Sequence, residues 1–210
     1  MVYRRGPAAC ERALQSRDKV LRAARAVVAV EGITGLSMAA VASEAGVAVG
    51  SLYRHFPSKT DLVTELLRST CEHELSVLRA IAAGRGDEPE TGDSAERLAA
   101  AVSVFTLRAL SSGRLAYAMI CEPTVAQAEL LRRRIRAEMA TILASIVADG
   151  VAEGSFAPQD PLLTGLALVG ALSEVLSAAE SFGIDLGHEH IVESIGAMAR
   201  RSVGAQREAA

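Results

Sequence analysis

The sequence predicts an all-α protein of about nine helices. Hydrophobic residues make up 50% of the 210 residues, yet aromatic residues make up only 3% and tryptophan is absent. Strands favour aromatic and β-branched residues, whereas alanine and leucine, which are abundant here, are strong helix formers. Residues 37–62 also read as two short helices joined by a glycine turn. We therefore expect a helix-turn-helix unit followed by a larger helical domain.

The N-terminal residues divide into an arm and a first helix. Residues 1–16 are polar, and we expect a flexible arm in which Arg4 and Arg5 are solvated rather than bound to DNA. Ser16 is placed to cap a helix that ends near Gly32. The apolar positions of this helix have the spacing of one buried face: Val20, Leu21, Ala24, Val27 and Val28.

Residues 37–62 carry the local signals of a helix-turn-helix. Ser37 can cap the first short helix, and Gly46 lies where the chain must leave that helix with a positive φ. Leu52 and Phe56, four residues apart, are expected to face inward and hold the second short helix against the core. This arrangement places its second helix in the major groove of DNA.

Four short motifs lie in fixed order within this segment. They are Gly-Leu-Ser at 35–37, Ala-Gly-Val at 45–47, Gly-Ser-Leu-Tyr-Arg-His-Phe at 50–56 and Ser-Lys-x-x-Leu at 58–62. Together they resemble the DNA-binding domain of the TetR family, over residues 17–67. The resemblance implies that residues 68–203 form a helical ligand-binding and dimerisation domain, followed by a tail at 204–210.

The second short helix carries the side chains that we expect to contact DNA. Tyr53, His55 and Lys59 offer donors for phosphate oxygens, and the resemblance points to the same positions. Arg54 is the residue best able to read guanine, and the small residues before it leave the remaining sequence choice to methyl contacts and DNA shape. The other predicted contacts lie at the starts of the two short helices: Ser37, Met38, Ala39, Ala48, Val49, Gly50 and Ser51. The contacts of Ser37, Met38 and Ala39, at the start of the first short helix, are implied by the resemblance.

Six further helices are expected after this unit. The first begins at Ser58, where Asp61 completes a capping box, and it continues into the second domain. Ser94 and Asp160 are the expected caps of two others, with Pro161 at a first helical position. The expected ranges are 58–81, 94–110, 115–121, 125–153, 161–182 and 188–203, with a loop at 83–93.

Charge is unevenly divided along the chain. Residues 1–68 hold 10 Lys and Arg against 6 Asp and Glu, a net charge of +4, whereas residues 69–210 hold 12 against 19, a net charge of −7. The basic end therefore carries the helix-turn-helix, as a DNA-binding surface requires. The arginine run Arg132, Arg133, Arg134 and Arg136 is expected to form a solvated helix face rather than a second nucleic-acid site.

The remaining patterns argue against other classes of protein. No apolar signal-peptide core and no uninterrupted apolar run of about 18 residues is present, which predicts a cytoplasmic protein. Cys10, Cys71 and Cys121 are far apart and are expected to be reduced thiols. His188 and His190 point to different sides of a helix, so we expect no metal site. No nucleophile–base pair or phosphate-binding glycine loop appears, so we expect neither an enzyme nor a cofactor.

The larger domain carries weaker signals for a ligand and a partner. The scarcity of aromatic residues favours an aliphatic or acyl-type ligand, with Arg108 as its carboxylate partner. The candidate ligand-binding residues are Phe105, Arg108, Tyr117, Met119, Met139, Ile142 and Leu166. Residues 161–179 are apolar nearly all round, which predicts burial on both sides and a dimer interface. The candidate interface residues, the last three placed by the resemblance, are Gly165, Leu168, Val169, Leu172, Val175, Leu176, Ile191, Ile195 and Met198.

Sequence and resemblance together predict a ligand-responsive transcriptional regulator. The resemblance implies a repressor that binds a palindromic double-stranded DNA operator as a homodimer. It also implies release when a small-molecule effector moves the helix that begins at Ser58. Two alternatives stay open: a ligand-independent regulator or activator of the same fold, and a helical small-molecule-binding protein without operator binding.

Overall fold

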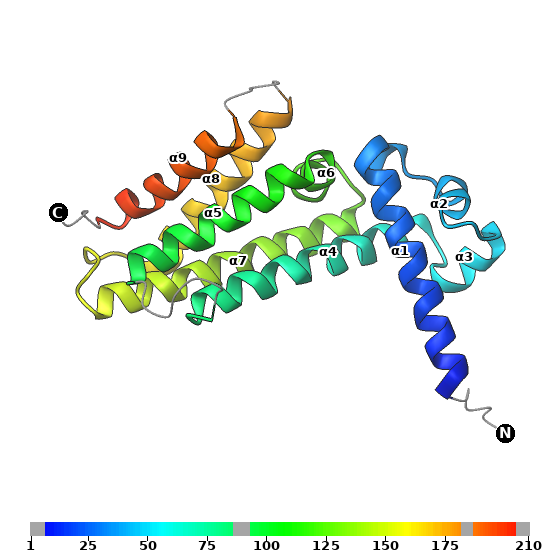
Figure 1. Cartoon of the computed structure of the whole chain (residues 1–210), viewed down its shortest axis with the longest axis horizontal. Coiled ribbons are helices and arrows are strands. Elements are labelled where there is room, and N and C mark those ends of the chain that lie inside the picture. The colour runs from blue at the N-terminus through cyan, green and yellow to red at the C-terminus, as the bar shows by residue number, and fades with distance from the viewer. Residues whose placement is uncertain (1–6, 86–92, 182–186, 205–210) are drawn as a thin grey trace.

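The chain is all-α, as the sequence predicts. A computed structural model describes residues 7–85, 93–181 and 187–204, and within these ranges it has nine helices and no strand (Figure 1). The helices are α1 (Pro7–Gly35), α2 (Met38–Glu44), α3 (Val49–His55), α4 (Lys59–Ala82), α5 (Ser94–Ser112), α6 (Arg114–Ile120), α7 (Ala126–Ala152), α8 (Pro161–Ser181) and α9 (His188–Ser202).

Two helical units share α4 and α6 as their connection. Helices α1, α2 and α3 pack together at one end of the molecule, and α4 runs from there along the second unit (Figure 1). In the second unit α4 packs against α7, α7 against α8, and α5 against α9. The short helix α6 contributes Ala118 and Met119 to the core of the first unit, and it contacts α1. Both α4 and α6 therefore link the two cores.

The first helix is longer than the sequence predicts. It begins at Pro7 rather than at Ser16, so residues 7–16, expected to be a flexible arm, are helical. No glycine or proline interrupts residues 8–15, and the Ser16 hydroxyl lies 3.0 Å from His55 Nε2 instead of capping a helix. The helix is broken at Gly32, where φ is 73°, a conformation that glycine adopts without steric cost. Arg4 and Arg5 lie outside the described residues.

Of the three caps expected after the helix-turn-helix, two act as predicted. Ser58 Oγ accepts from the Asp61 amide at 3.1 Å, and Asp160 Oδ1 accepts from the Leu163 amide at 2.9 Å. The third prediction is wrong by one residue. The cap of α5 is Asp93 rather than Ser94, because the Asp93 carboxylate accepts from the Glu96 amide at 2.8 Å. The expected loop at 83–93 falls mostly outside the described residues.

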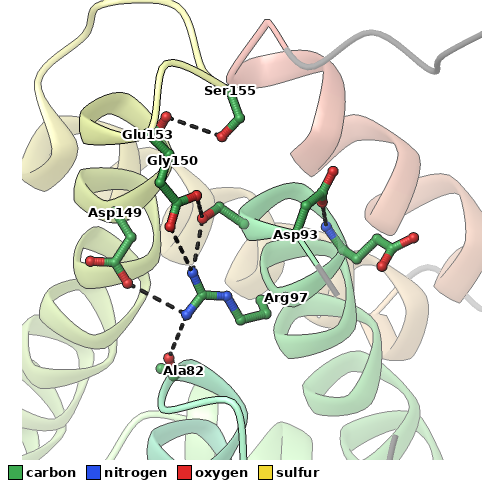
Figure 2. Close-up of polar contacts among 9 residues, drawn as sticks. Ala82, Asp93, Arg97, Asp149, Gly150, Glu153 and Ser155 are labelled. Carbon is green, nitrogen blue, oxygen red and sulfur yellow. Dashed lines mark hydrogen bonds and ion pairs between the residues drawn. The ribbon is translucent and has the colours of Figure 1, made fainter. Parts of the chain in front are cut away.

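Arg97 joins three helices at the end of the second unit farthest from α1–α3 (Figure 2). Its guanidinium donates to the Ala82 carbonyl at the end of α4 at 3.3 Å and to Ser94 Oγ at 2.9 Å. The same group lies 3.5 Å from an Asp149 oxygen and 3.8 Å from a Glu153 oxygen, both at the end of α7. One cation thus contacts a carbonyl of α4, a hydroxyl of α5 and two carboxylates at the end of α7.

Replacing Arg97 with methionine is expected to lower the free energy of unfolding by about 1–2 kcal/mol, because the substitution removes the donor of the partly buried Ala82 carbonyl and the cation that faces the half-exposed Asp149 and Glu153 carboxylates. Urea unfolding followed by circular dichroism measures the change. Arg133→Met is the control: that side chain is 74% exposed on α7, so a change within about 0.5 kcal/mol is expected. Equal unfolding midpoints for the two variants would show that the Arg97 contacts contribute nothing.

Candidate DNA-binding surface and internal cavity

Helices α2 and α3 are joined by a turn that the sequence specifies closely. Ser37 Oγ accepts from the Ala40 amide at 3.0 Å and caps α2. At the other end Gly46 has φ 61°, its amide donates to the Ser43 carbonyl, and the Val47 amide donates to the Ala42 carbonyl, each at 3.0 Å. These two bonds define a Schellman motif, which needs glycine at its left-handed position. The turn therefore fixes the angle at which α3 leaves α2.

One face of α3 is anchored and the other is open. Leu52 and Phe56 are fully buried, as predicted, and the Arg17 guanidinium lies 5.3 Å from the centre of the Phe56 ring. On the exposed side of α3, Val49 is 41% exposed and Tyr53 is 47% exposed. Large exposed apolar side chains one helical turn apart, on a helix that is otherwise firmly packed, are what a groove-binding surface needs.

Most of the predicted DNA contacts are accessible at the surface of the first unit. Ser37, Ala39, Ala48, Val49, Gly50, Tyr53 and Arg54 are exposed, and Ser51, His55 and Lys59 are half-buried. Met38 is the exception: it is only 8% exposed and belongs to the core of the first unit, so its side chain does not reach the surface. The prediction for Met38 is corrected accordingly.

Two of the predicted donors already have partners within the chain. Arg54 Nη2 donates to Ser51 Oγ at 2.8 Å, which lays the guanidinium along the exposed face of α3. His55 Nε2 lies 3.0 Å from Ser16 Oγ, so the imidazole connects α3 to α1. Tyr53, by contrast, presents an exposed hydroxyl-bearing ring on the same face.

A cavity of about 90 Å³ lies inside the second unit. Helices α4, α5, α6, α7 and α8 all contribute to its lining, which is mostly apolar. Of the predicted ligand-binding residues, Phe105, Arg108, Met119 and Met139 line it. Tyr117, Ile142 and Leu166 do not, and Leu166 instead lies on the outer surface. The sequence did not show which of the apolar residues in the other helices face the same space.

Arg108 is already paired and does not offer a free cation to a ligand. Its Nε and Nη2 donate to Glu74 Oε2 and Oε1 at 2.7 and 2.9 Å, a bidentate ion pair between α5 and α4. These bonds to Glu74 hold the pKa of Arg108 above its ordinary value. The expectation that Arg108 binds a ligand carboxylate is therefore revised.

The arginine run in α7 is only half solvated, contrary to the prediction. Arg133 and Arg134 are exposed, but Arg132 is buried and donates to the carbonyls of Met119, Ala118 and Glu122 at 2.9, 3.3 and 2.9 Å. Arg136 donates to the Ile120 carbonyl. The two inward arginines thus satisfy the free carbonyls at the C-terminal end of α6, where positive charge is favourable.

Glu122, which the sequence did not single out, connects this region to the DNA-binding unit. Its carboxylate accepts from the Ile33 and Thr34 amides, both at 3.0 Å, and from the Thr34 hydroxyl at 2.7 Å. Burial raises the pKa of Glu122, but the Thr34 and Ile33 donors and the charge of Arg114 lower it by more, so the pKa lies below the ordinary value. A charged carboxylate therefore joins the residue after α6 to the last turn of α1.

Gly32 makes this junction possible. A Cβ at Gly32 would lie 2.7 Å from Glu122 Oε2, which is closer than real Cβ contacts. Its positive φ also turns the following amides toward the carboxylate. The only sequence signals were a glycine at a helix end and a glutamate before a proline, and neither reveals the other as its partner.

The predicted dimer residues mostly pack inside their own chain. Leu168, Val169, Leu172, Leu176, Ile191 and Ile195 are buried, Val175 and Met198 pack against the same core, and Val169 and Leu172 also line the cavity. Gly165 faces α7, since a Cβ there would lie 2.3 Å from the Ala140 carbonyl oxygen. The outward face of α8 is instead formed by Leu162, Leu163, Leu166, Ala167 and Gly170, and the exposed Glu174 follows one helical turn later.

That outward face is strongly apolar. Leu163 is 67% exposed and Leu166 is 48% exposed, and a Cβ added at Gly170 would meet no other atom within 4 Å. Among the described residues, α8 is the one helix that is long and apolar enough to span a membrane by length and composition, with a mean hydropathy of 1.6 over Pro161–Ala178. Its other side packs on α7. A contiguous apolar face of this kind marks an interaction surface.

Comparisons with known proteins agree with both units. Residues 20–66 match the family model described as bacterial regulatory proteins, tetR family, and residues 91–177 match a tetracyclin repressor-like C-terminal domain. The HTH-type transcriptional repressor KstR of Rhodococcus jostii is 35% identical over 92 residues, 44% of this chain and 40% of the relative. KstR of Mycobacterium tuberculosis is 43% identical over 53 residues, 25% of this chain and 24% of the relative. The matched segments thus span well under half the length of these relatives.

Solved structures show the same fold over nearly the whole chain. The transcriptional regulator FadR of Bacillus subtilis, solved with stearoyl-CoA, superposes with a TM-score of 0.75 at 19% identity, covering 90% of this chain and 99% of that chain. A TetR/AcrR-family regulator from Thermobifida fusca superposes with a TM-score of 0.70 at 24% identity, covering 92% and 100%. Matching family models in both units, together with this fold, place the protein: the chain belongs to the TetR family of bacterial transcriptional regulators.

Proposed function

We propose that the protein is a ligand-responsive repressor that binds a palindromic operator as a homodimer and is released by a small-molecule effector. The observation that supports this most is the exposed face of α3, which the Schellman turn at Gly46 and the buried Leu52 and Phe56 hold in a fixed direction. The net positive charge of residues 1–68 favours contact with phosphates. The DNA-binding residues then fall within 17–67 and the effector and dimer surfaces within 68–203.

We propose that a second copy of the chain packs on the outward face of α8. Two-fold symmetry brings the same surface of each copy together, so exposed Leu163 and Leu166 would meet their counterparts, and Gly170 would permit close approach of the backbones. A dimer with two α3 helices matches half-sites about one helical turn apart. This placement replaces the inward-facing residues of α8 and α9 that the sequence suggested.

The cavity favours a regulator that responds to a ligand over one that does not. It is bounded by α4, which leads directly from the DNA-binding unit, and by α6, whose end is tied to α1 through Glu122. An effector that binds better to a conformation with displaced α4 or α6 would shift the dimer away from the DNA-binding state. The neighbour FadR was solved with stearoyl-CoA, which is consistent with an aliphatic or acyl-type effector in this family.

Phosphate contacts by Tyr53 and Lys59 are tested on a genomic fragment selected by the wild-type protein. Tyr53→Phe is expected to weaken binding about tenfold, because each dimer loses two hydrogen bonds to phosphate. Lys59→Gln is expected to reduce the magnitude of the slope of log K, the association constant, against log salt concentration by about 2. The reason is that each half-site then releases one counterion fewer on binding. Fluorescence anisotropy at several salt concentrations measures both quantities.

Tyr117→Phe serves as the control, since Tyr117 lies on α6 and not on the exposed side of α3. It should bind the fragment as the wild-type protein does. Wild-type affinity and salt dependence in both the Tyr53 and Lys59 variants would contradict the proposed surface.

A further inference from the structure

Within the proposed ligand-responsive function, we propose that the cavity binds a small aliphatic monocarboxylate whose carboxylate pairs with Arg136. The site combines one uncompensated guanidinium with an apolar space between α4, α5, α7 and α8. This assigns both the chemical class of the effector and the residue that selects it.

Arg136 differs from the other two arginines that line the cavity. Arg108 is held by Glu74 in a bidentate ion pair, and Arg132 is held by Glu129 at 2.7 Å in addition to three carbonyls. Arg136 donates to the Ile120 carbonyl, but within the described residues it has no carboxylate within ion-pair distance. Its Nε is buried and has no hydrogen-bond partner among those residues. An unpaired buried donor on a charged group is costly, and a carboxylate would satisfy it.

The ionisable groups at the cavity other than Arg136 cancel or are neutral, so the net charge there is about +1 and comes from Arg136. The Arg108–Glu74 and Arg132–Glu129 pairs each cancel. Burial, with a smaller contribution from Glu74, raises the pKa of the Cys71 thiol to about 12, so this sulfur is neutral at physiological pH. Arg136 is therefore the one charge at the cavity left for a ligand to neutralise among the described residues, and a monoanion matches it better than a cation or a dianion does.

The apolar wall and the size of the space define the rest of the ligand. Leu75, Leu78, Phe105, Met139 and Leu172 face the cavity and offer no hydrogen bonds. The volume of about 90 Å³ is smaller than the cavity of about 150 Å³ that holds benzene in an engineered protein. A chain of about four carbons is the size that these walls admit, whereas a longer acyl chain or a coenzyme A thioester would require the helices to separate.

Calorimetric titration of the full-length dimer with butyrate, hexanoate and octanoate tests the assignment. At least one of these carboxylates is expected to bind saturably. The corresponding amide, which has the same shape without the charge, is expected to bind at least about tenfold more weakly. Arg136→Gln is expected to weaken carboxylate binding by about tenfold or more, which corresponds to about 1.4 kcal/mol. Arg133→Gln, an exposed change one helical turn away, should bind as the wild-type protein does.

Three results would overturn the proposal: no binding of any carboxylate in the series, equal binding of the amide and the carboxylate by the wild-type protein, or tighter binding of hexanoyl-CoA than of hexanoate. The comparison of amide with carboxylate uses the wild-type chain, so it remains decisive even if Arg136→Gln unfolds. Unliganded wild-type protein is assayed separately for operator binding. Operator binding without carboxylate binding would refute this assignment alone, whereas loss of both would refute the regulatory function as well.

Discussion

Replacing Leu166 with arginine is expected to convert the proposed dimer into monomers and to weaken the proposed operator binding by about a hundredfold or more. Leu166 is 48% exposed at the centre of the outward apolar face of α8. A charge there would be buried twice in a symmetric interface, opposite its own copy. Once the copies separate, each α3 binds one half-site alone and the gain from simultaneous binding is lost. Light scattering coupled to size-exclusion chromatography gives the mass, and anisotropy gives the affinity.

Leu107→Arg is the matched control, because Leu107 on α5 is also 48% exposed but lies outside α8. This variant should remain dimeric and bind the operator normally. A Leu166→Arg protein that keeps the dimer mass at micromolar concentration would place the interface elsewhere. Equal disruption by both variants would indicate general destabilisation rather than a specific interface.

Replacing Glu122 with alanine is expected to lower the free energy of unfolding by about 2–4 kcal/mol and to weaken operator binding at the same time. The substitution leaves the buried Ile33 amide, together with the partly buried Thr34 amide and hydroxyl, without their acceptor. These residues lie just before Ser37, which caps α2, so their displacement also moves the helix-turn-helix. Chemical unfolding and anisotropy measure the two effects.

Glu193→Gln on the exposed face of α9 is the control for removal of one carboxylate, and it should change neither quantity. A Glu122 variant with lower stability but unchanged operator affinity would make Glu122 a stabilising contact only. In that case it would have no part in positioning the DNA-binding unit.

The pH dependence of stability at the same position follows from the lowered pKa of Glu122. Because the folded-state pKa lies below the unfolded value, near 4.5, the charged carboxylate contributes its full stability above that value and loses it as the pH falls through the folded-state pKa. The stability difference between wild type and Glu122→Gln should therefore be constant from about pH 7 to pH 5 and narrow below about pH 4. A difference that grew on acidification would contradict this account.

The DNA-binding unit was predictable because its signals are local. Ser37, Gly46, Leu52 and Phe56 each act within one turn of the chain, and each has the expected cap, φ or burial. Met38 was predicted as a DNA contact together with Ala39. Successive residues of a helix point about 100° apart, so Ala39 is exposed while Met38 faces the core. A family resemblance identifies positions but does not show which side chains point inward.

The interior of the second unit was less predictable because its contacts join distant segments. Arg132 and Arg136 sit in a run that resembles a solvated face, and only the tertiary position of α6 turns two of the four inward. Glu122 and Thr34 are likewise far apart in sequence. Helix α8 is apolar on nearly every side, so its pattern could not show which residues face α7 and which remain outside.

Nuclease footprinting of the wild-type protein on its selected genomic fragment tests whether the exposed side of α3 binds an operator. We expect two protected half-sites related by a two-fold axis and about one helical turn apart, with protection lost in the Tyr53→Ala, Lys59→Ala double variant. Protection should also be lost when the effector is added at saturating concentration. Absence of specific protection on any fragment, or residual binding that the double variant leaves unchanged, would contradict a DNA-binding regulator that uses this face of α3.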